Sequence, residues 1–202
     1  VVSLIFNLVL ALAFALYLLA QKETLTRQAK KVVQAIFSSK RAQQITELAH
    51  MTNRAFSNFV TGQLTEALIL GCLCFLGMLI FRLPYAGVIS VIIGFTALIP
   101  IFGAFIGVAI GALLILLVNP IQALWFILFI IVLQQIESNV IYPRVVGKSV
   151  GLPGIWVLAA VTIGGNAFGL LGMLFAVPLC SVLYAVARRV VHRRLAQKGL
   201  AP

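Results

Sequence analysis

The chain consists of long apolar runs and one long polar stretch. Residues 1–20 are apolar almost throughout, which is enough for one membrane span of about 20 residues. In residues 21–60 the apolar side chains recur every three or four positions, as on one face of a helix, and basic side chains occupy the other face. Ser38–Arg41 is predicted to interrupt this pattern. The stretch is therefore predicted to be an amphipathic arm, either on the membrane surface or packed as an ordinary solvated helix.

After the arm, the pattern predicts six crossings, at residues 62–81, 84–100, 103–118, 121–141, 153–168 and 170–187. Two of the apolar runs, residues 83–118 and 153–187, are too long for one span and contain helix-breaking residues near their middle. Each of these runs forms either two short spans or a re-entrant hairpin. The expected fold class is all-α: a polytopic helical membrane protein with two broken-helix or re-entrant hairpin units.

Proline and glycine mark the expected hairpin tips of the two broken units. The tip residues are Pro100 and Gly103 in the first unit, and Gly164, Gly165, Gly169 and Pro178 in the second. Non-helical backbone at membrane depth must be surrounded by protein or face a watery cavity, so both breaks are expected inside the protein. Bulky substitutions at Gly103 or Gly165 are expected to impair flux more than substitutions at Gly77, which lies in an unbroken span. Both units begin with Leu-Pro and reach Phe-Gly, which makes them a candidate inverted repeat.

Composition supports a membrane protein, because 62% of the residues are hydrophobic and only 9% are charged. The 15 Lys and Arg residues outnumber the 4 Glu residues, and most of them lie in residues 21–60 and 188–202. Basic clusters beside spans indicate cytoplasmic flanks that contact anionic lipids, and not nucleic acid. The arm and the C-terminus are therefore expected in the cytoplasm. The predicted segments are a span (1–20), the arm (21–60), a transport domain (61–187) and a basic tail (188–202), with further spans expected before Val1.

Polar side chains occur within two of the predicted spans. Gln134, Glu137 and Asn139 lie near the cytoplasmic end of one span, and Gln63 and Glu66 begin another. Ionisable groups inside spans are by default candidates for a functional site, so these residues are expected to line a substrate path. In the alternative, Glu137 is an interfacial anchor that pairs with a basic residue of the following loop. The candidate partners are Arg144 and Lys148.

Other chemistry is disfavoured. The three cysteines, Cys72, Cys74 and Cys180, lie in apolar runs and are expected to be free thiols. The sequence contains no metal-ligand spacing and no phosphate loop, HExxH motif or catalytic triad pattern. We therefore expect no catalytic residues, no metal, no cofactor and no enzymatic activity.

Four motifs in order resemble the autoinducer-2 exporter family of bacterial membrane transporters. They are "FSNFVTGQ", "LIPIFGAFIG", "QQIESNVIYPRVVGKSVGL" and "GGNAFGLLGMLFAVP". The resemblance implies a multi-pass protein of the bacterial inner membrane that exports a small polar solute, such as the quorum-sensing signal autoinducer-2. It also implies an elevator-like movement, a homo-oligomer (a pentamer) and a role for Asn166 at the second hairpin tip. Pro153-Gly154 departs from the family pattern, in which the proline usually comes one residue later.

Two other functions compete with solute export. A sodium or other cation/proton antiporter, using Na⁺ or H⁺, would normally need a carboxylate in the middle of a span, whereas both intramembrane Glu residues lie near span ends. A membrane scaffold or assembly protein would use the basic arm for docking, but it has no need of broken helices. Export of a small polar solute is therefore the leading prediction.

Overall fold

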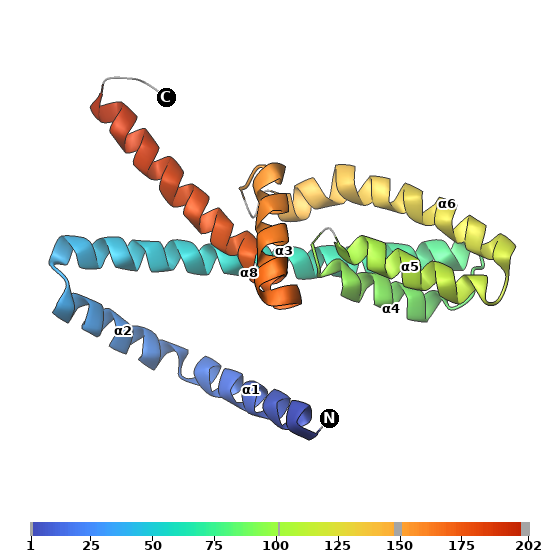
Figure 1. The fold of residues 1–202 in the computed structure, drawn as a ribbon, viewed down its shortest axis with the longest axis horizontal. Helices are drawn as coiled ribbons and strands as arrows, with labels where there is room; N and C mark the ends of the chain where they lie inside the picture. The colour runs from blue at the N-terminus through green and yellow to red at the C-terminus, as the bar shows by residue number, and fades with distance from the viewer. Residues whose placement is uncertain (1, 101, 148–150, 199–202) are drawn as a thin grey trace. The chain divides into compact units, whose positions relative to one another are not determined.

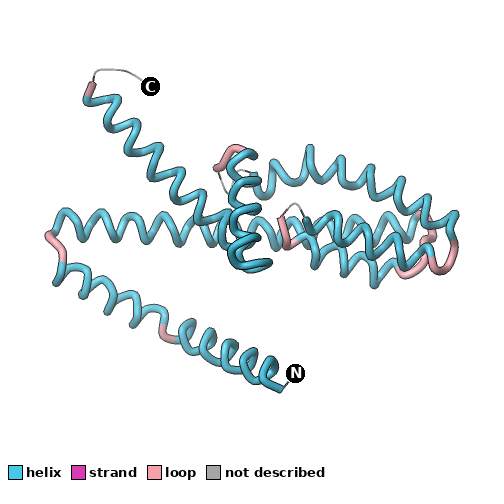
Figure 2. The backbone as a smooth tube through the Cα atoms, in the orientation of Figure 1, coloured by secondary structure: helices cyan, strands magenta, loops and turns pink. Residues whose placement is uncertain are grey.

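The computed structural model describes residues 2–100, 102–147 and 151–198, and within these ranges the chain is helical without any β-strand. The helices are α1 (Val2–Ala20), α2 (Lys22–Ile36), α3 (Ser39–Ile80), α4 (Ala86–Ala97), α5 (Phe102–Leu116), α6 (Pro120–Ile136) and α8 (Gly154–Gln197) (Figure 1). Two short π-helical segments, η1 (Glu137–Ile141) and η2 (Pro143–Gly147), follow α6. The loops among the described residues are short (Figure 2). The prediction of an all-α protein is confirmed.

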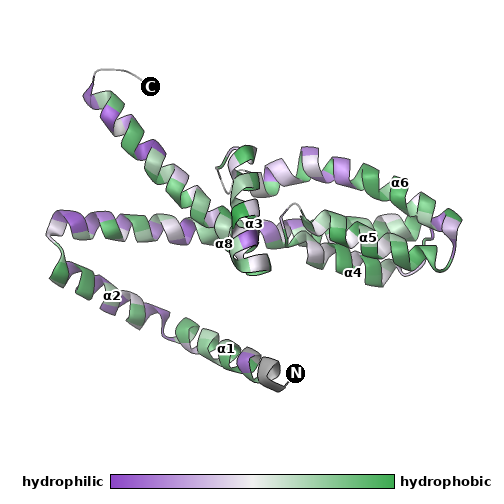
Figure 3. Cartoon of the chain, in the orientation of Figure 1, coloured by the Kyte–Doolittle hydropathy of each residue, from purple (hydrophilic) through white to green (hydrophobic). Residues whose placement is uncertain are grey.

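The chain divides into two compact units, Val1–Met51 and Thr52–Pro202. In the first unit, α1 is apolar and the helix axis bends by 71° before the amphipathic α2. None of the residues of α2 is buried. The helix ends at Ile36 and α3 begins at Ser39, so the break lies at the start of the predicted interruption. Hydrophilic residues are frequent along α2 and along the first part of α3, whereas α4 and α5 are mainly hydrophobic (Figure 3).

Helix α3 continues through the predicted boundary between the arm and the transport domain. It runs for 42 residues, from the basic segment into the apolar one, without a break at residues 60–61. The reason is that both segments carry helix-compatible residues, and a change from polar to apolar composition does not interrupt the backbone hydrogen bonds of a helix.

By length and composition, three helical segments could cross a membrane: Ser39–Ile80, Pro120–Val145 and Gly154–Gln197, the last of which is interrupted at Phe168 and Gly169. A fourth crossing is obtained if the bent pair of α1 and α2 counts as one span. The described part of the chain is therefore that of a polytopic membrane protein. It supports fewer full crossings than predicted.

The first broken unit is a hairpin of two short helices. Helix α4 has 12 residues and α5 has 15, and the two helices pack on each other. At about 1.5 Å per residue they are roughly 18 and 22 Å long, less than the hydrocarbon core of about 30 Å. The predicted crossings at 84–100 and 103–118 are thus too short to be full spans, and the lengths favour the hairpin alternative.

The second broken unit lies within α8. Phe168 and Gly169 have non-helical backbone angles, with Gly169 at φ 61° and ψ −142°, a region that favours glycine. The chain folds back there, because the Cys180 Sγ atom lies 3.8 Å from the Trp156 carbonyl oxygen and the Trp156 and Tyr184 rings are 6.4 Å apart. The predicted break between residues 168 and 170 is thus observed as a tight turn between two antiparallel helical arms.

Two of the predictions for this second turn need correction. Pro178 is buried inside the second helical arm and not at the turn, because only Phe168 and Gly169 have non-helical angles. The turn is also not enclosed within this chain, since the Phe168 side chain is 80% exposed. The proposed inverted relation between the two hairpins stays a prediction.

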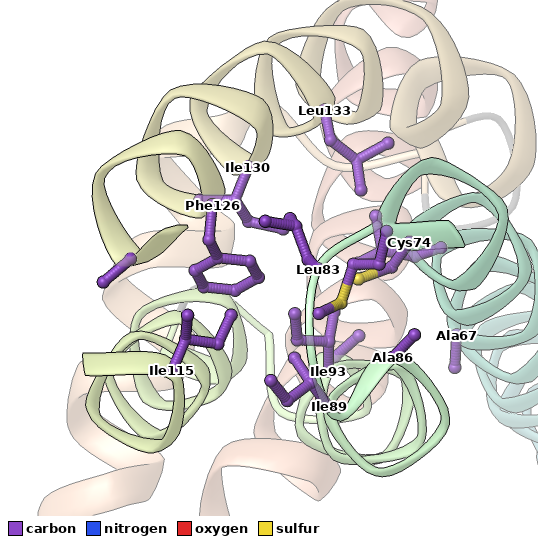
Figure 4. Packing of buried hydrophobic residues seen from close by; sticks show 14 residues of the cluster. Ala67, Cys74, Leu83, Ala86, Ile89, Ile93, Ile115, Phe126, Ile130 and Leu133 are labelled. Carbon is purple, nitrogen blue, oxygen red and sulfur yellow. The ribbon is translucent and has the colours of Figure 1, made fainter. Parts of the chain in front are cut away.

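The main core of the second unit joins α3, α4, α5 and α6. The cluster includes Cys74 and Met78 of α3 and Ile89 of α4. The Phe126 ring of α6 lies beside Ile115 of α5 in the same cluster (Figure 4). A smaller cluster lies around the second hairpin, where Phe59 of α3 packs with Val161 and Val177 of α8. These two clusters hold the hairpins against α3.

Glycines bring the helix backbones close together in both hairpins. A Cβ atom added at Gly103 would overlap the carbonyl of Thr96, and one at Gly164 would overlap the carbonyl of Gly172. A Cβ atom added at Gly77 would meet the Phe129 ring, so α3 and α6 also pack closely at this glycine. The expected order of flux, with Gly103 and Gly165 more sensitive to substitution than Gly77, stays a prediction.

Candidate functional site

A polar pocket lies beside the tip of the α4–α5 hairpin. It encloses about 290 Å³, close to the lower end of the range of roughly 300–1,000 Å³ for small-molecule sites. Its polar lining comes from α3 and from the junction of α6 with η1, and Pro100 of the hairpin turn completes one wall. Four of the six predicted path residues line it: Gln63, Glu66, Gln134 and Glu137.

The α3 side of the pocket contains two buried polar side chains one helical turn apart. Gln63 is 4% exposed and Glu66 is 5% exposed. The Gln63 Nε2 atom donates a hydrogen bond of 3.0 Å to Glu66 Oε2 and one of 2.8 Å to the carbonyl oxygen of Ala97. Ala97 is the last residue of α4, and its carbonyl is one of the terminal helix acceptors that have no partner in their own helix. Gln63 therefore attaches α3 to the end of the first hairpin arm.

Two polar atoms of the pocket have no hydrogen-bond partner. They are Gln63 Oε1 and Gln134 Nε2. The orientation of the Gln63 amide follows from its surroundings, since the Ala97 carbonyl can only accept a hydrogen bond and so requires the Nε2 atom. Buried polar groups are nearly always paired, and an unpaired one costs about 1–3 kcal/mol. The residues that line the pocket therefore contain an unused acceptor and an unused donor.

The winding of the helix changes where α6 reaches the pocket. Glu137 begins η1, the first of two π-helical segments, and Pro143 begins the second. Pro143 has no backbone N–H to donate to the carbonyl of Asn139, so the regular α-helical hydrogen-bond pattern cannot continue. Short π-helical segments are frequent at functional sites.

The carboxyl groups of Glu66 and Glu137 interact with each other across the pocket. The predicted pairing of Glu137 with Arg144 is wrong, because the Arg144 Nη1 atom donates to the Val140 carbonyl at 3.3 Å and Arg144 is exposed. Lys148 lies outside the described residues. Within the described part of the chain, no basic side chain forms an ion pair with either carboxyl group.

The structure does not bring every predicted site residue to the pocket. Asn139 is exposed, and its Nδ2 atom donates to the carbonyl and the side-chain oxygen of Gln135. Asn166 is exposed near the tip of the second hairpin. Gly165 faces Met173 across that hairpin, and Gly169 forms the turn itself. Pro100 is the only predicted hairpin-tip residue among those that line the pocket.

Two polar residues of the lining were missed in the sequence. Ser138 lies four positions after Gln134, and its Oγ atom donates to the Gln134 carbonyl at 2.8 Å. That helical spacing could have identified it. Tyr142 also lines the pocket, but its position depends on the wider π-helical winding, which α-helical spacing does not anticipate.

The fold and the pocket define a class of protein: a polytopic helical membrane protein whose polar intramembrane side chains meet at a short hairpin, as in membrane transporters. The profile of the AI-2E family transporter matches residues 1–192, and the chain belongs to this family. The family is one of transporters and not of enzymes.

Several relatives carry the names of transport proteins. YueF of Bacillus subtilis (strain 168) is 32% identical over 134 residues, which are 66% of this chain and 36% of YueF. YrrI of the same organism is 36% identical over 130 residues, which cover 64% of this chain and 36% of YrrI. PerM of Escherichia coli (strain K12), named as a permease, is 25% identical over 154 residues, or 72% of this chain and 42% of PerM. The matched regions thus span about a third to two fifths of these relatives. No solved structure matches the chain.

Proposed function

We propose that the pocket beside the first hairpin is the solute site of a secondary transporter that exports a small polar solute. The observation that carries this proposal is the meeting of Gln63, Glu66, Gln134 and Glu137, from two membrane-spanning segments, at the tip of a hairpin too short to span. Polar groups in a bilayer are costly unless they pair or face a watery cavity. Groups retained there without full pairing are best explained by a passing solute.

The unpaired atoms indicate which hydrogen-bonding groups the solute should carry. Gln63 Oε1 needs a donor and Gln134 Nε2 needs an acceptor, so a solute carrying both, such as a hydroxyl-bearing molecule, fits the pocket. A volume of about 290 Å³ limits the solute to a small one. Autoinducer-2 is the first solute to test, and export into the periplasm across the inner membrane is the direction we propose.

The first hairpin is the part that we propose moves, in an elevator-like step relative to its neighbours. Part of its contact with α3 is made by small residues, since the Cα atom of Gly94 lies 3.7 Å from a Cβ built on Gly71, and a Cβ built on Gly94 lies 3.1 Å from the Ala67 carbonyl oxygen. Small residues let the two backbones approach closely there without interlocking side chains. The hydrogen bond from Gln63 to Ala97 would have to break during the movement.

Solute flux from liposomes that contain the full-length protein tests the proposal. Glu137→Gln keeps the shape of the side chain and removes its charge, and we expect it to lower flux at least about tenfold, the effect of losing a charged hydrogen bond of roughly 1.5–3 kcal/mol. Glu23→Gln is the matched control, because Glu23 lies on the exposed first turn of α2. Equal flux in Glu137→Gln and Glu23→Gln would contradict the assignment of the pocket.

A further inference from the structure

The carboxyl pair in the pocket has no basic partner among the described residues. Glu66 is 5% exposed and interacts directly with the carboxyl group of Glu137. Two neighbouring carboxylates repel strongly away from bulk water, so a retained pair either shares a proton or has a positive charge close by. The nearest basic residue in the chain after Glu137, Arg144, is bonded to the Val140 carbonyl instead.

An independent observation points to the same place. Gln63 is 4% exposed, lines the pocket and has a side-chain oxygen without any partner. Its Nε2 atom is fully used by Ala97 and Glu66, so the amide cannot turn to relieve the oxygen without losing both bonds. The three residues that carry this amide oxygen and the two carboxyl groups thus line one small space.

All of these ligating atoms are oxygens, the ligand type that hard cations prefer. The described residues contain no group of three or more His, Cys, Asp or Glu side chains that could hold a metal ion. Two carboxyl groups and one amide are too few protein ligands for the six or more oxygens of Ca²⁺ and lack the nitrogen or sulfur that transition metals prefer, so an alkali ion or an ammonium group suits them better.

We propose that Glu66, Glu137 and Gln63 Oε1 form a subsite for a small monovalent cationic group in the pocket. This inference rests on the proposed function, because it assigns part of the same solute site. The cationic group comes either from an alkali ion that accompanies the solute or from an ammonium group on the solute. The same oxygens can bind either an alkali ion or an ammonium group. Gln134 Nε2 stays available to donate a hydrogen bond to an acceptor on the solute.

Thermal unfolding of the purified full-length protein in detergent at pH 8 tests the subsite. The probes are sodium chloride and methylammonium chloride, each exchanged against N-methylglucamine chloride so that ionic strength stays constant. We expect at least one probe to raise the Tm with a saturable dependence on concentration, as binding to the folded state requires. Saturation by sodium alone identifies an alkali ion, and saturation by methylammonium alone identifies an ammonium group; either result supports the subsite.

Substitutions then test whether the rise in Tm comes from cation binding at the carboxyl pair. Glu137→Gln preserves volume at a half-buried position, and we expect it to raise the half-saturating concentration at least about tenfold, whereas the Glu23→Gln control should match the unsubstituted protein. Unchanged half-saturation in both Glu137→Gln and Glu66→Gln would overturn the subsite. If neither probe raises the Tm of the unsubstituted protein, or if its stability responds only to pH, a cation does not occupy the pair and the inference is also overturned.

The flux assay separates this inference from the proposed function. Solute flux that depends on Glu137 without any cation response would remove the cation subsite and leave the solute site in place. A saturable cation response lost in Glu137→Gln, together with solute flux that is unaffected by the substitution, would retain the subsite and remove the solute site.

Discussion

Replacing Gly103 by alanine should separate the α5 arm of the first hairpin from α4. Gly103 is buried in the first turn of α5, and an added Cβ would overlap the backbone carbonyl of Thr96. A backbone atom cannot move aside by rotating a side chain. One turn later, a Cβ on Gly107 would lie 2.5 Å from Thr96 Oγ1 and 3.1 Å from Ile93 Cγ1, so the helix cannot shift in that direction either.

The magnitude follows from a matched comparison. Gly87→Ala lies in α4 of the same hairpin, where an added Cβ meets nothing within 4 Å. Both substitutions gain about 1 kcal/mol of helix propensity, so the difference between the two variants isolates the overlap. Overpacking costs typically about 1–3 kcal/mol, and we expect Gly103→Ala to be less stable than Gly87→Ala by that amount.

Denaturant unfolding of the purified protein in detergent measures this difference, and the liposome flux assay measures its consequence. We expect Gly103→Ala to lose flux as well, because Pro100 of the same turn forms a wall of the pocket. If the free energies of unfolding of the two variants agree within about 0.5 kcal/mol, the ordinary size of a surface substitution, the close approach of α5 to α4 is refuted.

Three further outcomes are expected. Phe126→Ala should destabilise the protein by about 3–5 kcal/mol in the same unfolding assay, because the ring is 0% exposed, while Trp125→Ala, at 57% exposed, should cost much less; similar losses would contradict the core assignment. Asn119→Ala should lower the free energy of unfolding by about 0.5–2 kcal/mol, since the Asn119 side chain caps α6 by accepting hydrogen bonds from the backbone N–H groups of Ile121 and Gln122. An unchanged free energy of unfolding would argue against the cap. Arg41→Cys, in a protein without other cysteines, should react with an impermeant maleimide in inverted vesicles only; labelling of intact cells would overturn the cytoplasmic placement of the arm.

The polar pocket was predictable because its side chains obey helical spacing. Gln63 and Glu66 are three residues apart, as are Gln134 and Glu137, so each pair shares a helix face. Because the sequence around each pair is apolar, these polar side chains need hydrogen-bond partners inside the protein. Four polar side chains in two spans can serve as partners for each other. The same reasoning places Pro100 at a turn, since a proline inside an apolar run removes a backbone donor.

Other features depend on contacts that spacing does not reveal. Charge and proximity in the sequence suggest a pairing of Glu137 with Arg144, but the Arg144 side chain donates to the Val140 carbonyl instead. At Gly77, Phe129 of the distant helix α6 packs on the glycine. This contact has no local signature, since both partners are ordinary residues of regular helices.

The two hairpins use the same device to bring their arms together but differ in chemistry. In each, a glycine faces a backbone carbonyl of the opposite arm: Gly103 faces Thr96, and Gly164 faces Gly172. At the first tip, the carbonyl at the end of α4 is bonded by the buried Gln63, and carboxyl groups lie beside it. At the second tip, the Phe168 side chain is exposed. A polar solute would gain hydrogen bonds at the first tip and meet an apolar ring at the second. We therefore propose that the solute site belongs to the first hairpin.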